Sequence, residues 1–416
     1  MTHHYIGYRS AAWKQSPMAD LDHLLASFES GDLERPDAAR PNFLDLVRAI
    51  AAVAGVPDLE LTPNGEAIRD RISGPDHLVF VLVDGLGADV LERTLSPDSW
   101  LRRHVVHTIQ SVYPPTTGAA ITSVATGEWP AVHGVVGWWT YLSRLAGTAC
   151  ILPFVRHRDG APLVDCGIEP AHTFPPSLTS RMTRDTAVAQ PSAIIDSVYS
   201  TWFGNGAATI PYQNHTAAVL AIAARIRAAT RPTHTYWYTP IVDREAHEHG
   251  TGSARTRTAV LDVDRALQRL AAELAGRDAR IVVTADHGHR DVGQRFPIER
   301  DDPLCDFLRT PPSGDMRVAF YHLQNGARRA FTSEFQARFG EHFALITTDQ
   351  LEQLRLLGPI PLAAETRARV GDCASVALDA SVMRYTGGFD GDHFMHQRSH
   401  HSGLSPAEMT IPLIIA

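Results

Sequence analysis

The chain has 416 residues, of which 44% are hydrophobic and 20% are charged, and its formal net charge is −8 at pH 7. This composition is typical of a globular protein, and the length predicts two or three domains or one large α/β domain that carries insertions. An acidic chain without a basic run is a poor match for a nucleic-acid polymer or an anionic membrane surface.

The cysteines and the first residues bear on the cellular compartment. The four cysteines lie far apart and form no CxxC pair, which argues against a disulfide framework or a thiolate zinc site. The first 20 residues lack the apolar core of a signal peptide, and no run of 18 apolar residues occurs. We therefore expect a cytoplasmic protein without membrane contact.

Residues 1–75 are predicted to form an N-terminal helical arm, because apolar residues in the segment 43–54 recur at helical spacing. The segment 77–85, "HLVFVLVDG", is a continuous apolar run that ends in Asp84 and a glycine. Such a run is typical of a strand that is buried on both faces of a parallel sheet. Asp84 is interpreted either as a turn residue or as a functional carboxylate.

The stretch "YPPTTGAAITSVATG" (113–127) predicts the start of a helix among unusually small residues. Ser and Thr are favoured at helix N-caps, so Thr116 and Thr117 have a purely structural explanation. The alternative is that one hydroxyl reacts, with small neighbours leaving room for a substrate. In that case the backbone N–H groups from Gly118 onward would face a phosphate oxygen.

Two later segments repeat the pattern of a buried strand that delivers an acid. "THTYWYTPIVD" (233–243) ends in Asp243, and "RIVVTADHG" (280–288) carries Asp286 after a predicted helix over 254–275. Strands that alternate with helices predict an α/β sheet, and ligands of such sheets gather beyond the carboxyl ends of the strands. Three strands therefore deliver a carboxylate to the edge where ligands bind.

Histidines accompany these acids at spacings that suit a metal ion. In "DREAHEHG", Asp243 and His247 are four residues apart and share one face of a helix, whereas His249 points to another face. A carboxylate and an imidazole at this spacing form half of a zinc-like site, although a solvated polar loop would explain them equally. In "TADHGHRD", the adjacent Asp286 and His287 can reach one metal ion where the chain leaves the strand.

The end of the chain adds a group of late histidines before a terminal apolar strand: His393, His396, His400 and His401. Three aspartates and at least three histidines are enough for two metal ions with three protein ligands each. Two ions about 4 Å apart stabilise the attacking and leaving oxygens of a phosphoryl displacement. Thr117 then gains a role, because coordination to a metal turns an alcohol into a nucleophile.

The motifs "VLVDG", "YPPTTGAAITSVATGEWPAVHGVVG", "DREAH", "TADHG" and "HHSGLSPAEMTIPL" resemble, in this order, the alkaline phosphatase superfamily, nearest to its nucleotide pyrophosphatase/phosphodiesterase type. The resemblance implies an alkaline-phosphatase-like three-layer α/β sandwich with a mostly parallel central sheet and inserted cap segments. The division that we predict is a catalytic core of 76–140, 231–314 and 381–416, a cap insertion of 141–230 and a small α+β insertion of 315–380.

The resemblance also implies roles for individual residues. The nucleophile falls on Thr117, which would bridge both metal ions. One ion would be held by Asp243, His247 and a late histidine, and we choose His401 over His400 because it directly precedes a small residue and a glycine. The second ion would be held by Asp84, Asp286 and His287. Zinc suits this mixture of nitrogen and oxygen ligands, and Mn²⁺ would also suit it.

The implied function is hydrolysis of a small-molecule phosphate ester, a phosphodiester or nucleotide pyrophosphate, through a phospho-threonine intermediate. The sequence departs from the family at Ala120, where an asparagine that binds a phosphate oxygen is expected three residues after the nucleophile. A phosphomonoesterase or phosphonate hydrolase is therefore the alternative, and a catalytically silent binding protein is the alternative from another class. The aromatic residues Trp138, Trp139 and Tyr141 are interpreted either as the leaving-group pocket or as core packing.

Overall fold

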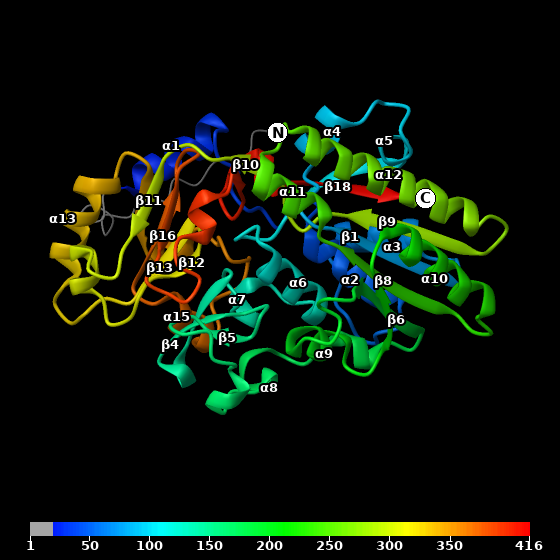
Figure 1. Cartoon of the computed structure of the whole chain (residues 1–416), viewed down its shortest axis with the longest axis horizontal. Helices are drawn as coiled ribbons and strands as arrows, with labels where there is room; N and C mark the ends of the chain where they lie inside the picture. The colour runs from blue at the N-terminus through cyan, green and yellow to red at the C-terminus, as the bar shows by residue number, and fades with distance from the viewer. Residues whose placement is uncertain (1–19) are drawn as a thin grey trace, which may run out of the picture.

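The computed structural model describes residues 20–416, which form two adjoining lobes, each built on its own seven-stranded sheet (Figure 1). Among these residues, no helix is both long and apolar enough to cross a membrane. Residues 1–19 of the predicted N-terminal arm lie outside the described residues. The rest of that arm forms the three helices α1 (Leu21–Ser30), α2 (Phe43–Val53) and α3 (Pro63–Ile72).

The larger lobe contains the mostly parallel sheet that the sequence predicts. Its strands follow the order β2-β18-β9-β1-β8-β6-β7, and all of them point the same way except β18, which is antiparallel to both neighbours. The strands are β1 (His77–Val83), β2 (Val105–Gln110), β6 (Asp185–Pro191), β7 (Ala208–Tyr212), β8 (Thr233–Thr239), β9 (Ala279–Thr284) and β18 (Thr410–Ile415).

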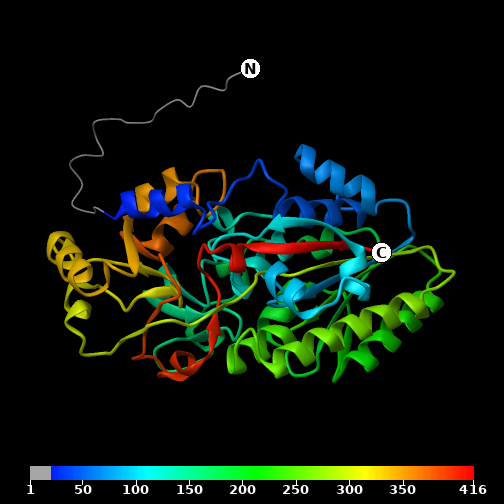
Figure 2. The ribbon, with the colours of Figure 1, turned by 90° about the horizontal axis from the view of Figure 1, so that it is seen from above.

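Helices cover both faces of this sheet. Seen from above, α2 and α3 lie on one side of the sheet, and α10 (His215–Ala228) and α12 (Ala254–Glu273) lie on the other (Figure 2). The central strands are therefore buried on both faces, and every residue of β8 is buried. This is the reason for the continuous apolar run in β1. The predicted three-layer α/β sandwich is confirmed.

The smaller lobe contains an antiparallel sheet with the order β14-β15-β13-β12-β3-β4-β5. Its strands are β3 (Trp139–Leu142), β4 (Gly147–Cys150), β5 (Val155–Arg156), β12 (Ser313–Asp315), β13 (Val318–Tyr321), β14 (Phe343–Thr347) and β15 (Cys373–Ala377). Two short pairs complete the strands: β10 (Arg290–Asp291) with β17 (Ser399–His400), and β11 (Arg295–Ile298) with β16 (Val382–Tyr385). The remaining α-helices are α4 (Ala88–Thr94), α5 (Trp100–His104), α6 (Thr117–Thr126), α7 (Pro130–His133), α8 (Pro170–Thr173), α9 (Val198–Gly204), α11 (Ile241–His249), α13 (Arg328–Phe339), α14 (Thr348–Gln353), α15 (Ala364–Val370) and α16 (Pro406–Met409).

The sheets cross the segment boundaries that we predicted from the sequence. The segment 141–230 is not a separate cap, because it supplies β6 and β7 to the central sheet and β4 and β5 to the second sheet. The segment 315–380 shares its sheet with these strands. The sequence did not predict this arrangement, because β6, "DTAVAQP", has only three apolar residues between polar ones and shows no clear strand pattern. The division into functional domains stays a prediction.

Candidate metal-dependent active site

Three aspartates meet at the carboxyl edge of the large sheet. Asp84 directly follows β1, Asp286 lies two residues beyond β9, and Asp243 belongs to the first turn of α11, which follows β8. The three strands are neighbours in parallel register, so their ends lie side by side. Asp84 is 2% exposed and Asp286 is fully buried. The structure thus brings together the carboxylates that the sequence placed at this edge.

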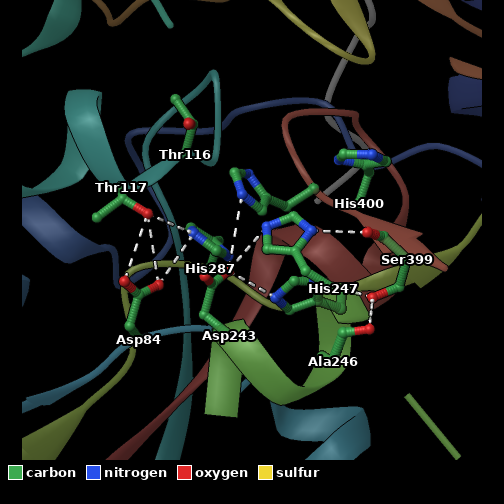
Figure 3. A network of polar contacts seen from close by, with 12 residues as sticks. Asp84, Thr116, Thr117, Asp243, Ala246, His247, His287, Ser399 and His400 are labelled. Carbon is green, nitrogen blue, oxygen red and sulfur yellow. Dashed lines mark hydrogen bonds and ion pairs between the residues drawn. The ribbon is translucent and has the colours of Figure 1, made fainter. Parts of the chain in front are cut away.

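Thr117 is the first residue of α6 and points at this acidic edge (Figure 3). Its Oγ1 lies 3.2 Å from Nε2 of His287 and 3.4 Å from Oδ1 of Asp84. The neighbouring Thr116 occupies the N-cap position, but its hydroxyl makes no capping hydrogen bond. It donates instead to Oδ2 of Asp315, at 2.7 Å. The capping explanation for Thr116 is therefore wrong, and its hydroxyl ties the start of α6 to β12 of the second sheet.

The first group of possible metal ligands consists of Asp84, Asp286 and His287, whose ligand atoms all lie within 4.8 Å of one another. Burial raises the pKa of Asp84 well above its usual value, and the neighbouring carboxylates of Asp286 and Asp243 raise it further. Burial also raises the pKa of Asp286. Two buried carboxylates side by side repel each other, and a cation between them removes that repulsion.

The second group consists of Asp243, His247 and His401. Oδ1 of Asp243 lies 3.1 Å from Nε2 of His247, one helical turn away, and 3.8 Å from Nε2 of His401. Burial alone would raise the pKa of Asp243, but His247 and His289 hold it well below its usual value. The spacing of four residues on a helix, which the sequence predicted, therefore does place these two side chains together.

The histidine rings of both groups are oriented by backbone carbonyls. Nδ1 of each ring lies at hydrogen-bond distance from one carbonyl oxygen: His247 from Ser399 at 2.7 Å, His287 from Gly288 at 3.0 Å, and His401 from Pro115 at 3.1 Å. A carbonyl only accepts, so Nδ1 carries the hydrogen and Nε2 keeps its lone pair. This is the tautomer in which Nε2 binds a metal ion and the other nitrogen fixes the ring.

The carboxylates complete the fit to a divalent cation. Oδ1 of Asp286 accepts hydrogen bonds from the backbone N–H groups of Gly85 at 3.1 Å and His287 at 3.0 Å. Its Oδ2 is buried and has no hydrogen-bond partner among residues 20–416. A buried carboxylate oxygen without a donor is costly unless it binds a cation. Together with three Nε2 lone pairs, it matches the donor set of zinc or a similar ion.

The other histidines that the sequence singled out lie outside these groups. Nε2 of His400 donates to the carbonyl of Phe394 at 2.9 Å, and His400 belongs to neither group. His249 is exposed and pairs with the acids of its own helix, Glu245 and Glu248. The two remaining late histidines, His393 and His396, are also exposed.

Sequence reasoning missed three residues that contact the predicted ligands. Nε2 of His289 lies 2.9 Å from Oδ1 of Asp243, and its Nδ1 lies 3.1 Å from the hydroxyl of Ser399. That hydroxyl donates to the carbonyl of Ala246 at 2.7 Å (Figure 3). Tyr238 donates to Oδ2 of Asp84. His289 could have been found from the sequence, because it belongs to the "DHGH" pattern. The contacts of the Ser399 and Tyr238 hydroxyl groups could not, because they depend on pairing between segments far apart in the chain.

The three aromatic residues that follow Thr117 in the sequence divide between packing and partial exposure. Trp139 is buried, with the guanidinium of Arg384 4.1 Å from the centre of its ring. Tyr141 lies against His322 with ring centres 4.1 Å apart. Trp138 is half-buried, and its backbone N–H donates to Oδ2 of Asp315 at 3.1 Å. Trp138 is thus connected to the start of α6, because the same Asp315 oxygen accepts the hydrogen bond of the Thr116 hydroxyl.

Comparison with protein families gives a match over most of the chain. The model of "Type I phosphodiesterase / nucleotide pyrophosphatase" matches residues 78–151 and 154–355. No curated protein sequence matches the chain.

Solved structures with the same fold include murine and human ectonucleotide pyrophosphatase/phosphodiesterase 5. The murine protein is 17% identical with a TM-score of 0.57, and the human protein is 15% identical with a TM-score of 0.58; each alignment covers 81% of this chain and 87% of the other. An inactive Thr-to-Ala variant of the murine protein has been solved with AMP. Phosphonoacetate hydrolase from Sinorhizobium meliloti, solved with phosphonoformate, is 18% identical with a TM-score of 0.56, and the alignment covers 82% of this chain and 90% of the hydrolase.

Proposed function

The chain belongs to the type I phosphodiesterase/nucleotide pyrophosphatase family of the alkaline phosphatase superfamily and is a phosphoester hydrolase; from this we propose that it cleaves phosphodiesters or nucleotide pyrophosphates with Thr117 as its nucleophile. The observation that carries the proposal is the position of the Thr117 hydroxyl. It lies 3.2 Å from Nε2 of His287 and 3.4 Å from Oδ1 of Asp84, at the start of a helix and next to one of the groups of side chains that could hold a metal ion.

The residues fit two divalent cations, zinc or, alternatively, manganese. Asp243, His247 and His401 would hold one ion, and Asp84, Asp286 and His287 would hold the other. When bound, such ions lower the pKa of a coordinated hydroxyl or water and neutralise the negative charge that builds up on the phosphoryl oxygens. The buried carboxylates and the three carbonyl-oriented imidazoles support this assignment.

The reaction is a double displacement at phosphorus. The Thr117 oxygen attacks phosphorus in line with the leaving group, forms a new oxygen–phosphorus bond and breaks the bond to the leaving alcohol, which takes up the proton that Thr117 loses. In the second step a water oxygen attacks the same phosphorus on the side of Asp243, His247 and His401. The bond to Thr117 breaks, and a proton from that water restores the hydroxyl. Backbone N–H groups at the start of α6 face a nonbridging oxygen throughout.

The substrate is proposed to be a small phosphate ester with an organic leaving group. The AMP complex of the murine relative supports a nucleotide-like ligand. The alternative, a phosphomonoesterase or phosphonate hydrolase, is supported by the fold of phosphonoacetate hydrolase and by Ala120, a buried methyl group where an amide was expected. Rates on bis-p-nitrophenyl phosphate and p-nitrophenyl phosphate separate diester from monoester cleavage. A cytoplasmic location stays a prediction.

Replacing the nucleophile tests the proposal. We expect Thr117→Ala to lower turnover of bis-p-nitrophenyl phosphate by about 10³-fold or more, because no other hydroxyl occupies its position. Thr117→Ser keeps the hydroxyl and should retain measurable turnover. Metal analysis should find two ions per chain in all three proteins, which excludes collapse of the site as the cause. Full activity of Thr117→Ala would rule out the assigned nucleophile, and a metal-free wild-type protein would favour a silent binding protein.

A further inference from the structure

Tyr238 lies near the end of β8, at the edge of the sheet that carries the proposed active site. It is the penultimate residue of β8 and lies opposite Leu82 of β1 in the parallel register. The backbone N–H of Asp84 donates to the carbonyl of Thr239 at 3.0 Å, which fixes the end of β1 against the end of β8. This pairing brings the phenol ring of Tyr238 beside the Asp84 carboxylate.

The Tyr238 hydroxyl donates a hydrogen bond to Oδ2 of Asp84. A phenol keeps its proton near neutral pH, so it donates to a carboxylate rather than competing for a cation. The other contacts of Asp84 are longer: Oδ1 lies 3.4 Å from Nε2 of His287, and the Thr117 hydroxyl lies 3.4 Å from Oδ1 and 3.5 Å from Oδ2. Tyr238 thus occupies Oδ2, while Oδ1 is the atom nearest the imidazole of the proposed metal group.

Tyr238 is itself fixed by burial and by a hydrogen bond to its backbone. It is 6% exposed, and its own backbone carbonyl accepts a 2.6 Å hydrogen bond from the hydroxyl of Tyr212, which ends β7. The end of β8 is therefore tied to β1 on one side and to Tyr212 of β7 on the other, and the buried ring has little freedom to move. A hydrogen bond from an immobilised donor fixes the plane of the carboxylate, as partners of metal ligands generally do.

A second tyrosine on the same strand shows that a buried tyrosine at this face of β8 does not need a hydrogen-bond partner for its hydroxyl. Tyr236 precedes Tyr238 by two residues, so both side chains point to the same face of the sheet. Tyr236 is 2% exposed, and its hydroxyl has no hydrogen-bond partner among the described residues. The two side chains share burial, strand and face, and they differ in the contact of the hydroxyl with Asp84.

We propose that Tyr238 is a positioning residue: it fixes the Asp84 carboxylate so that Oδ1 faces the cation at the proposed catalytic centre. This inference rests on the proposed function, because it assigns Tyr238 a role through Asp84 and Thr117. Tyr238 touches neither substrate nor cation, and its effect is on the geometry and affinity of one of the two metal groups.

The test compares Tyr238→Phe with the matched control Tyr236→Phe. Each variant loses one buried hydroxyl and keeps its ring. Zinc binding to metal-depleted protein is measured by isothermal titration calorimetry. We expect Tyr238→Phe to weaken the affinity of one of the two zinc sites by about 10- to 100-fold and to leave the other unchanged. Tyr236→Phe should bind both ions as the wild type does. The absorption spectrum of the cobalt-loaded protein should change in the first variant only.

A double-mutant cycle keeps the test decisive if Tyr238→Phe also lowers stability. In an Asp84→Asn background the tyrosine acts on no carboxylate, so adding Tyr238→Phe should change zinc affinity no further. Wild-type zinc affinity and cobalt spectrum in Tyr238→Phe would overturn the inference, as would an equal loss in Tyr236→Phe. Neither outcome affects the proposed function, which fails on a different result: turnover that survives Thr117→Ala.

Discussion

Single residues of the site owe their orientation to contacts that no motif displays. The hydroxyl and the carbonyl of Ser399 orient His289 and His247, respectively, and both groups come from a two-residue strand, β17. The candidate ligands were recognisable in the sequence, because carboxylates and imidazoles at strand ends have a chemical meaning in themselves. The hydroxyl and carbonyl partners were not, since Ser, Tyr and backbone groups occur everywhere in a sequence.

The choice between the two adjacent late histidines leads to a prediction. His401 lies in the group with Asp243 and His247, whereas His400 donates to the carbonyl of Phe394. We expect His401→Ala to lower the metal content from two ions to about one per chain and to reduce turnover by at least about 10-fold. His400→Ala is the matched control and should keep both ions. Metal analysis of the dialysed proteins decides, and the reverse pattern would exchange the two assignments.

Segments far apart in the chain are joined around Thr117. The carbonyl of Pro115 lies within hydrogen-bond distance of Nδ1 of His401 and accepts from the backbone N–H of Ser402. The helix α16 that follows is fastened to the turn between β12 and β13 by a buried ion pair between Glu408 and Arg317, at 2.7 Å. Burial alone would raise the pKa of Glu408, but the guanidinium keeps it below its usual value. The segment that carries His401 and the loop before Thr117 therefore hold each other in place.

A close approach between two glycines predicts a position near the start of α6 where an added side chain is not tolerated. A Cβ on Gly137 would lie 2.1 Å from the carbonyl oxygen of Gly314, next to the Asp315 that binds Thr116. Backbone atoms cannot rotate away, so Gly137→Ala should destabilise the protein by about 1–3 kcal/mol and displace the start of α6. Gly252→Ala is the control, because no described atom beyond its neighbours lies within 4 Å of the added carbon. Chemical denaturation and activity assays of both variants test this, and equal stability would contradict it.

The sequence predicted elements better than the assignment of segments to sheets. The buried strands 77–85, 233–243 and 280–288 appear as β1, β8 and β9, slightly shortened, because continuous apolar runs have few other uses. The predicted cap missed β6 and β7, whose residues alternate without a clear period. Sheet membership depends on pairing between distant segments, which a single sequence does not encode locally.

The candidate active site lies where the carboxyl edge of the large sheet meets the second sheet (Figure 1). The stability of this assembly should depend on pH through buried histidines outside the site. His234 is 3% exposed, and neither of its ring nitrogens has a hydrogen-bond partner among residues 20–416. Burial lowers its pKa to about 3, and Arg184 and Arg225 act in the same direction.

The sign of the effect follows from the two states of His234. The unfolded chain binds a proton near pH 6.5, whereas the folded protein binds one only near pH 3. The free energy of unfolding should therefore fall as the pH drops from 6.5 towards 3. His234→Leu should remove this part of the dependence and raise stability most at acidic pH, while His107→Leu, at an exposed position, should not. Denaturation between pH 7 and 5 measures the difference, and parallel curves for wild type and His234→Leu would contradict it.

The stereochemical course at phosphorus tests the covalent Thr117 intermediate most directly. Two successive in-line displacements each invert the phosphorus centre, so the double displacement predicts net retention of configuration. The measurement is the configuration of the product formed from an isotopically chiral phosphodiester. Retention is the result that we predict. Net inversion would mean that water attacks the substrate directly and that Thr117 forms no bond to phosphorus.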